Sequence, residues 1–262
     1  MIKLLSRLRR LVFGEHQSQW TEQNEAVQRI LKRRSVRKFL DREVPASDLQ
    51  LILDAGRFAP SSVNLQTWSF ICFSRQDWQE IFNSKIPFNG SYAIVVCADL
   101  NRVFRSLPPA RKSPQLSHTL AVFNVGLAAM NMTIAAEFLG LHSIMLSETG
   151  RTGILDLEYL HTMLNLPNDV IPLTTLVLGY AAVPLLGVPP RFDRNTVIHN
   201  RQYQPAQREA IEEWLAQMKL GFQISTLGGR FEQKTDYYMK RFAEVESVLS
   251  RLLNSWKEED AK

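Results

Sequence analysis

Residues 33–68 decide the fold. They open with Arg33-Arg34-Ser35-Val36-Arg37-Lys38-Phe39 and close with Pro60-Ser61-Ser62-Val63-Asn64-Leu65-Gln66-Thr67-Trp68. Between these two runs, apolar residues recur at helical spacing from Leu49 to Gly56, with Ser47 placed as the helix cap. The helix should stop before the proline. We therefore predict one helix that joins a basic segment (residues 33–39) to a serine turn (residues 60–67).

The basic segment has the chemistry of a phosphate site. Three guanidinium groups, those of Arg33, Arg34 and Arg37, surround the hydroxyl of Ser35. Guanidinium groups bind phosphate oxygens in a bidentate manner, and a hydroxyl adds a further donor. A solvated face or a nucleic-acid or targeting patch has the same composition, so the segment alone leaves these alternatives open.

The serine turn offers short hydroxyl and amide groups before a predicted strand, which suits a ligand in an irregular turn. The alternative is a capped loop in which Trp68 holds the core. Neither segment contains a nucleophile paired with a base. The chain also lacks the GxGxxG and GxxxxGK[ST] patterns, so it carries neither a Rossmann dinucleotide fingerprint nor a P-loop.

The composition is that of a globular protein. The chain has 262 residues, 45% of them hydrophobic, and a formal charge of +5. Much of the basic excess precedes residue 43, which indicates a local anion site rather than a nucleic-acid coat. Cys72 and Cys97 lie in apolar runs typical of buried strands, without a metal-binding or disulfide spacing, and the five histidines are scattered. We expect a cytoplasmic protein without a bound metal.

Residues 1–24 form a basic arm. Residues 1–13 mix cations with apolar residues, so they lack the uninterrupted apolar region of a signal peptide. Leu4, Leu8 and Leu11 fall at helical spacing, which allows an amphipathic helix in peripheral contact with an anionic membrane. A frayed arm, or a helix packed on the domain, is the alternative.

The middle of the chain alternates short strands and helices. Strands are predicted at residues 68–73, 92–98, 143–146 and 173–180, and helices at 25–32, 119–139 and 155–164. Residues 101–117 combine three prolines with four cations, which is typical of a loop and suggests a mobile lid. Residues 170–190 are uncharged, but their prolines indicate a strand and a loop rather than a membrane span.

Residues 204–262 form a helical extension. A helix is predicted over residues 207–220, ending at Gly221. After Gly228-Gly229, a second helix carries apolar residues at heptad spacing, namely Tyr238, Phe242, Val245, Leu249, Leu252 and Trp256. This seam packs either on its own domain or across a dimer.

The order of these features resembles the FMN-dependent nitroreductase family over roughly residues 25–203. The matching residues are the basic segment, Val44-Pro45, Ala59 with the serine turn and Trp68, Asn131, Ala135-Ala136, Gly140-Leu141, Leu164-Asn165-Leu166-Pro167, Leu178-Gly179-Tyr180, Arg191, Val197-Ile198-His199 and Tyr203.

The resemblance implies an α+β fold, a three-layer α-β-α domain with a mixed, mainly antiparallel sheet. It also implies an intertwined homodimer with FMN at the interface. The phosphate-binding residues would be Arg33, Arg34, Ser35, Arg37 and Arg191. Other cofactor-binding residues would be Pro60, Ser61, Ser62, Asn64, Asn83, Thr149 and Gly150, with a backbone amide of the last two near flavin N5.

Three departures from the family pattern affect the expected substrate preference more than FMN binding. Thr67 stands where proline usually follows the glutamine, Asn124 where an aspartate is common, and Pro189 where some members have a second phosphate-binding lysine.

The activity implied is an FMN-dependent oxidoreductase that takes hydride from NAD(P)H by a ping-pong mechanism. Its second substrate would be a small oxidised organic acceptor, such as a nitroaromatic compound or a quinone, and no catalytic side chain is required because the cofactor carries the chemistry. The alternative is a flavin-binding or interaction module that retains the fold without the activity.

Overall fold

The computed structural model describes residues 24–148, 150–183, 189–224 and 231–258. Contacts divide them into two compact units. The first comprises the described residues of Asn24–Pro184 and Phe242–Lys262, and the second those of Leu185–Arg241. The predicted boundary at residue 203 therefore falls inside the second unit, and the end of the helical extension belongs to the first. The predictions for residues 1–23 lie outside the described residues.

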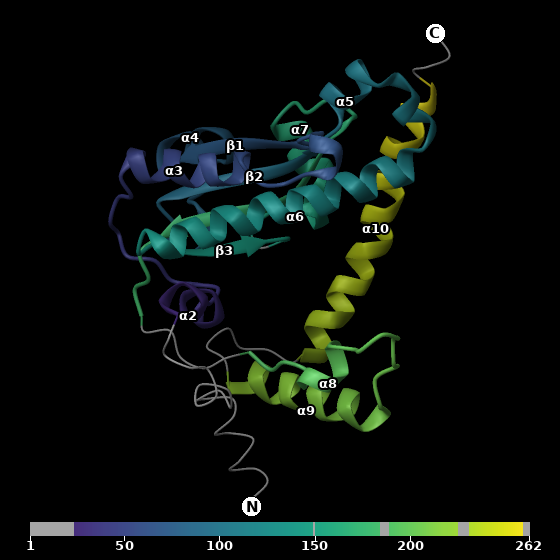
Figure 1. Ribbon diagram of the computed structural model, residues 1–262. Helices are drawn as coiled ribbons and strands as arrows, with labels where there is room; N and C mark the ends of the chain where they lie inside the picture. The colour runs from purple at the N-terminus through teal and green to yellow at the C-terminus, as the bar shows by residue number, and fades with distance from the viewer. Residues whose placement is uncertain (1–23, 149, 184–188, 225–230, 259–262) are drawn as a thin grey trace, which may run out of the picture. The chain divides into compact units, whose positions relative to one another are not determined.

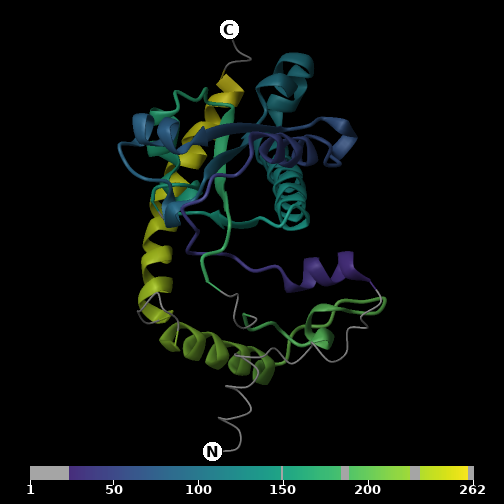
Figure 2. The same cartoon turned by 90° about the vertical axis from the view of Figure 1, so that its left-hand side faces the viewer.

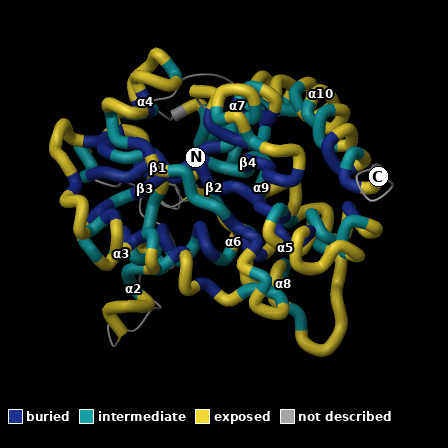
Figure 3. The backbone as a smooth tube through the Cα atoms, turned by 90° about the horizontal axis from the view of Figure 1, so that it is seen from above, coloured by how far each residue is buried: buried dark blue, intermediate teal, exposed yellow. Residues whose placement is uncertain are grey.

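The first unit is built on a four-stranded sheet in the order β1-β2-β4-β3 (Figure 1). The strands are β1 (Trp68–Ser74), β2 (Tyr92–Asp99), β3 (His142–Leu146) and β4 (Val170–Gly179), each close to its predicted range. All three pairings are antiparallel, and β2 carries an irregularity at Val96/Cys97. β2 and β4 are central and almost entirely buried, as the dark blue in Figure 3 shows.

One face of the sheet packs against α3 (Ala46–Arg57) and α6 (Pro114–Phe138), which runs along the sheet in Figures 1 and 2. Alternate strand residues, including Ile94 and Leu176, meet Ile52 and Met132 of these helices. A Cβ atom on Gly56 would lie 2.7 Å from Met132 Cγ, so the glycine permits this close approach. The prediction for the cap was wrong, because α3 has Pro45 at its N-cap and no side-chain hydrogen bond there.

The other face packs against α4 (Arg75–Phe82) and the short helix η2 (Pro87–Asn89). Trp78 of α4 is buried there beside Val95 and Cys97. Ser74 caps α4 in a capping box with Asp77. Cys97 is buried as predicted, but Cys72 is exposed, so the prediction for Cys72 was wrong.

Residues 101–117 are helical rather than a loop. They form α5 (Asn101–Ser106), η3 (Pro108–Lys112) and the first turn of α6. Pro108 and Pro114 each stand in the first turn of a helix, where proline is tolerated, and this explains why their presence misled the prediction. Two of the four cations are paired: Arg102 with Asp99 at 3.2 Å, and Arg111 with Asp169 at 3.8 Å.

The first unit also contains η4 (Ile154–Asp156) and α7 (Leu157–Met163), which lie between β3 and β4 in the chain. The C-terminal part of α10 (Phe231–Glu258) packs on the core of this unit. Trp256 is fully buried, donates its Nε1–H to the Asn168 carbonyl at 2.9 Å, and meets the Phe104 ring edge-on at 5.1 Å. Of the two alternatives for the heptad seam, packing on its own domain is therefore correct for residues from Val245 onward.

The second unit contains α8 (Arg194–Val197), α9 (Arg208–Ile224) and the first turns of α10. Phe192 stacks on Trp214 with ring centroids 4.9 Å apart, and Lys219 pairs with Glu232 at 2.8 Å. Helix α9 continues through Gly221 to Ile224, so the predicted end at Gly221 was wrong.

Among the described helices, α6 alone is long and apolar enough to cross a membrane by length and composition. Its packing against all four strands identifies it as a core helix with one uncovered face. Residues 170–179 form strand β4, as predicted, rather than the start of a span.

Candidate functional site

The basic segment follows α2 (Glu25–Lys32) and continues along one end of the sheet. The Val36 amide donates to the Ser143 carbonyl at 3.1 Å, and the Phe39 amide donates to the Phe88 carbonyl of η2 at 3.1 Å. Isolated bridges join Ser35 to Ser143 in parallel and Phe39 to Ala181 in antiparallel fashion. The segment is therefore fixed between β3, β4 and η2.

The basic segment has two buried side chains separated by exposed polar ones. Val36 and Phe39 are buried, whereas Ser35 and Arg37 are exposed. Phe39 packs on Gly179: a Cβ atom there would lie 2.9 Å from Phe39 Cδ1. The apolar residues thus hold the hydroxyl and the guanidinium group at an accessible surface.

The other arginines lie beside the C-terminus of α6. Arg34 donates to the Leu31 and Arg33 carbonyls at 3.0 and 2.7 Å, so part of its guanidinium group caps α2. Arg29, which the sequence analysis missed, donates to the Glu137 carbonyl at 3.4 Å. Burial raises the pKa of the Glu137 carboxyl to about 7, against the opposing effect of Arg33, Arg29 and Arg34. The only sequence signal for Arg29 is its position in the last turn of a helix that leads into the basic segment.

This region also contains buried polar atoms without a hydrogen-bond partner among the described residues. They are His142 Nδ1, Ser143 Oγ and Glu137 Oε1. Unsatisfied buried polar groups are rare in folded proteins and need a specific explanation. Two of the three belong to the start of β3, where Ser143 is the bridge partner of Ser35. The start of β3, next to the basic segment, is therefore an unusually polar part of the buried structure.

A glycine loop (residues 147–153) follows β3. Gly150 has a φ of +74°, and a Cβ atom on Gly153 would lie 2.5 Å from Ser147 Cα, so the loop requires both glycines. β4 supports its ends, because Thr174 donates to the Leu146 carbonyl at 2.9 Å and Thr175 donates to the Thr152 carbonyl. These threonines were not predicted from the sequence.

The short helix η2 connects the glycine loop to the basic segment. A Cβ atom on Gly150 would lie 2.9 Å from Pro87 Cγ, and the neighbouring Phe88 accepts the Phe39 amide. Asn83 is the exposed C-cap of α4, four residues before η2, with a left-handed backbone. Gly150 therefore packs against η2, which is bonded to the basic segment through Phe39 and follows Asn83 in the chain, while Thr149 lies outside the described residues.

The serine turn contains the short helix η1 (Ser62–Asn64) and three non-glycine residues with left-handed backbones, Val63, Asn64 and Gln66. Inside the turn, Ser61 Oγ accepts the Gln66 amide at 3.0 Å, and Gln66 Nε2 donates to Asn64 Oδ1 at 3.3 Å. Pro60 and Asn64 are exposed, and Val63 is 92% exposed. The turn is thus rigid at its base and open at its tip.

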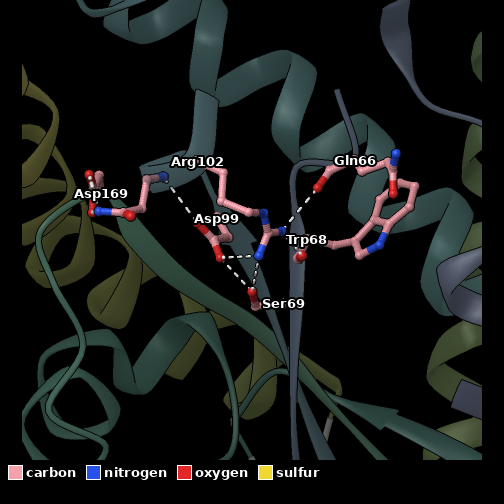
Figure 4. A network of polar contacts seen from close by, with 7 residues as sticks. Gln66, Trp68, Ser69, Asp99, Arg102 and Asp169 are labelled. Carbon is pink, nitrogen blue, oxygen red and sulfur yellow. Dashed lines mark hydrogen bonds and ion pairs between the residues drawn. The ribbon is translucent and has the colours of Figure 1, made fainter. Parts of the chain in front are cut away.

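Arg102 holds one end of the serine turn (Figure 4). Its guanidinium group donates to the Gln66 carbonyl at 3.1 Å and to the Trp68 carbonyl, and it pairs with Asp99 at 3.2 Å. Asp99, nearly buried, also accepts from Ser69 Oγ and from the Asn101 amide. Arg102 therefore has a supporting role: it fixes the end of the serine turn to β1 and β2.

The predicted site residues fall into two groups within the first unit. The serine turn contacts α6 at Asn124, and the arginines lie near Glu137, thirteen positions further along the helix. That separation corresponds to about 20 Å along the axis. Arg191 belongs to the second unit, where it donates to the carbonyls of Pro189 and Pro190 at 3.4 and 3.3 Å. Its part in the phosphate site stays a prediction.

Comparison with known proteins identifies the family of this chain. The model of the nitroreductase family matches residues 30–90, which include both the basic segment and the serine turn. A provisionally named NADH dehydrogenase/NAD(P)H nitroreductase from Archaeoglobus fulgidus is 30% identical over 161 residues, covering 60% of this chain and 85% of that protein. The chain belongs to the nitroreductase family.

Two further relatives extend the nitroreductase match. The FMN reductase (NADPH) of Bacillus subtilis is 28% identical over 194 residues, covering 69% of this chain and 75% of that protein. The structure of the NADPH:FMN oxidoreductase from Vibrio harveyi, complexed with NAD⁺, has a TM-score of 0.69 at 22% identity. It covers 89% of this chain and 98% of that chain, and so confirms the predicted α+β nitroreductase fold.

Proposed function

We propose that this nitroreductase is an FMN-dependent oxidoreductase that uses NAD(P)H to reduce small oxidised organic acceptors such as nitroaromatic compounds and quinones. The family match and the name of the Bacillus subtilis FMN reductase support the cofactor and the reductant. FMN, when bound, would supply the hydride-transfer chemistry between NAD(P)H and the acceptor, in a ping-pong order, and the residues of this chain would bind and orient it.

The observation that carries this proposal is the basic segment fixed at the end of the sheet. Ser35 and Arg37 are exposed beside Arg33, while the buried Val36 and Phe39 determine their direction. Because the backbone that carries these arginines is already fixed, only their side chains need to be ordered when a phosphate binds. These residues would hold the FMN phosphate, with Arg191 as a further candidate.

The glycine loop would supply backbone donors to the isoalloxazine ring. Gly150 and Gly153 permit a compact loop, and Thr174 and Thr175 of β4 fix its ends. Backbone N–H groups in such a loop can stabilise negative charge on the ring without a titratable side chain. Asn83, beyond η2, would reach the pyrimidine end of the ring.

A homodimer would complete the site. The uncovered face of α6 exposes Leu116 and Phe123, each 60% exposed, together with Leu120 and Val122. A contiguous apolar surface of this kind marks a protein interface, and a twofold axis would place the same helix on both sides. The serine turn, about 20 Å along α6 from the arginines, would then contact the ring of the partner's FMN.

The test is FMN binding by Arg37→Glu, with Lys112→Glu as a control at an exposed cation of η3. Loss of a charged hydrogen bond costs ~1.5–3 kcal/mol, so the Kd for FMN should rise about 10- to 100-fold in Arg37→Glu. The control should bind FMN like the wild type. An Arg37→Glu protein that binds FMN with unchanged affinity contradicts the assignment of the basic segment.

A further inference from the structure

Asn124 is a fully buried polar side chain in the apolar helix α6. Its Oδ1 atom accepts the Ser62 amide at 3.1 Å and the Ser62 hydroxyl at 3.3 Å. Its Nδ2 atom donates to Thr67 Oγ1 at 2.9 Å. One amide group therefore bridges Ser62, the third residue of the serine turn, to Thr67, the last.

The orientation of this amide follows from chemistry. The Ser62 backbone N–H can only donate, so the oxygen of Asn124 must face it and the NH₂ group must face Thr67. Thr67 is also buried, and its carbonyl accepts the Asp99 amide at 3.1 Å. The bridge thus joins the turn both to α6 and to the end of β2.

The turn needs such external bonds because its backbone is strained. Val63, Asn64 and Gln66 have φ values of 51°, 56° and 48°. Non-glycine residues adopt this conformation only where the surrounding structure enforces it, and a β-branched residue such as valine does so least readily. The exposed tip, including Asn64, keeps its shape only while the ends of the turn are held.

We propose that Asn124 and Thr67 act as a pair of positioning residues that set the shape of the serine turn, and through it the contact with the isoalloxazine ring. Both side chains are buried beneath the turn, so they would act on the cofactor only through the turn. This inference rests on the proposed function, because it assigns the turn to the flavin site.

Each substitution at the bridge has a distinct expected effect. Asn124→Leu keeps the approximate size but leaves the Ser62 amide and the Thr67 hydroxyl without their partner. Asn124→Asp retains an acceptor for Ser62, and the Thr67 hydroxyl can rotate to donate to the carboxylate. Thr67→Val removes only the acceptor of Nδ2. The loss of function should therefore increase in the order Asn124→Asp, Thr67→Val, Asn124→Leu.

The experiment measures the Kd for FMN, the visible circular dichroism of bound FMN, and the KM and kcat for a quinone acceptor in the full-length protein. Thr133→Val is the matched control, because Thr133 is a buried polar residue of the same helix whose hydroxyl makes no hydrogen bond to the described residues. Urea unfolding of each variant verifies that it is folded.

We expect Asn124→Leu to change the dichroism of bound FMN and to raise the Kd for FMN about tenfold, whereas Thr133→Val stays within about twofold. Recovery of both values in Asn124→Asp separates positioning from a general loss of stability. If Asn124→Leu does not fold, Thr67→Val must show a smaller change of the same kind.

The inference is overturned if folded Asn124→Leu shows the FMN dichroism and the FMN affinity of the wild type. If Asn124→Leu does not fold, wild-type values in Thr67→Val overturn it. Either result leaves the proposed function intact. A wild-type protein that does not bind FMN at all would overturn both.

Discussion

Gly179→Ala tests whether core packing positions the basic segment. The added Cβ atom would lie 2.9, 3.1 and 3.2 Å from Cδ1, Cγ and Cβ of Phe39. These atoms are at the base of the phenyl side chain, so a change of its far end cannot relieve the overlap, and the whole residue must shift. Overpacking of this kind costs ~1–3 kcal/mol. Because Arg37 is two residues away, the shift should also displace its guanidinium group.

The assay has two parts, urea unfolding of the FMN-free protein and titration with FMN. We expect Gly179→Ala to lower the unfolding free energy by ~1–3 kcal/mol and to weaken FMN binding. Phe39→Ala in the same chain removes Cγ and Cδ1 of Phe39 and should relieve most of the overlap, so the double variant should lose less stability than the sum of the two single variants. A Gly179→Ala protein within ~0.5 kcal/mol of the wild type, with unchanged FMN affinity, would refute the reasoning.

Three further perturbations test other parts of the structure. Burial raises the pKa of Glu137 from 4.5 to about 7, so the Glu137 carboxyl keeps its proton in the folded state, and the stability that this provides is lost as the pH rises through about 7. In urea unfolding across this pH range, Glu137→Gln should therefore show a smaller decline in unfolding free energy than the wild type. An unchanged decline would contradict the assignment to Glu137. Trp256→Ala should lower the unfolding free energy by ~3–5 kcal/mol, whereas Glu246→Ala, on the exposed side of α10, should change it by less than ~0.5 kcal/mol. Equal losses of unfolding free energy in the two variants would contradict the packing of α10 on the first unit. Phe123→Asp should convert the proposed dimer to a monomer in light scattering while Ile81→Asp on α4 does not, and a dimer that survives Phe123→Asp would exclude the α6 face.

The sequence predicted the elements whose residues show a clear period. The four strands and the helices near residues 25–32, 46–57 and 157–163 are present with small shifts at their ends. Residues 101–117 were misassigned because proline is common both in loops and in the first turn of helices, and only the structure distinguishes the two positions. Cys72 was misassigned because β1 is an edge strand, which a period of apolar residues does not reveal.

The supporting residues of the site could not be predicted in the same way. Asn124 contacts residues about sixty positions away in the sequence, and Thr175, in the middle of β4, donates to the Thr152 carbonyl of the glycine loop. Such contacts depend on how helices and strands are arranged, and neither residue has a local pattern that marks it. The left-handed backbone of Val63 is equally hidden, since valine disfavours that conformation in isolation.

The most direct test of the central claim is the visible absorption spectrum of the purified wild-type protein, followed by anaerobic titration with NADPH and NADH. The account predicts the bands of an oxidised flavin, either as isolated or after reconstitution with FMN, and their bleaching by a reduced nicotinamide nucleotide. A colourless protein that cannot be reconstituted with FMN, or a bound flavin that neither nucleotide bleaches, would contradict it.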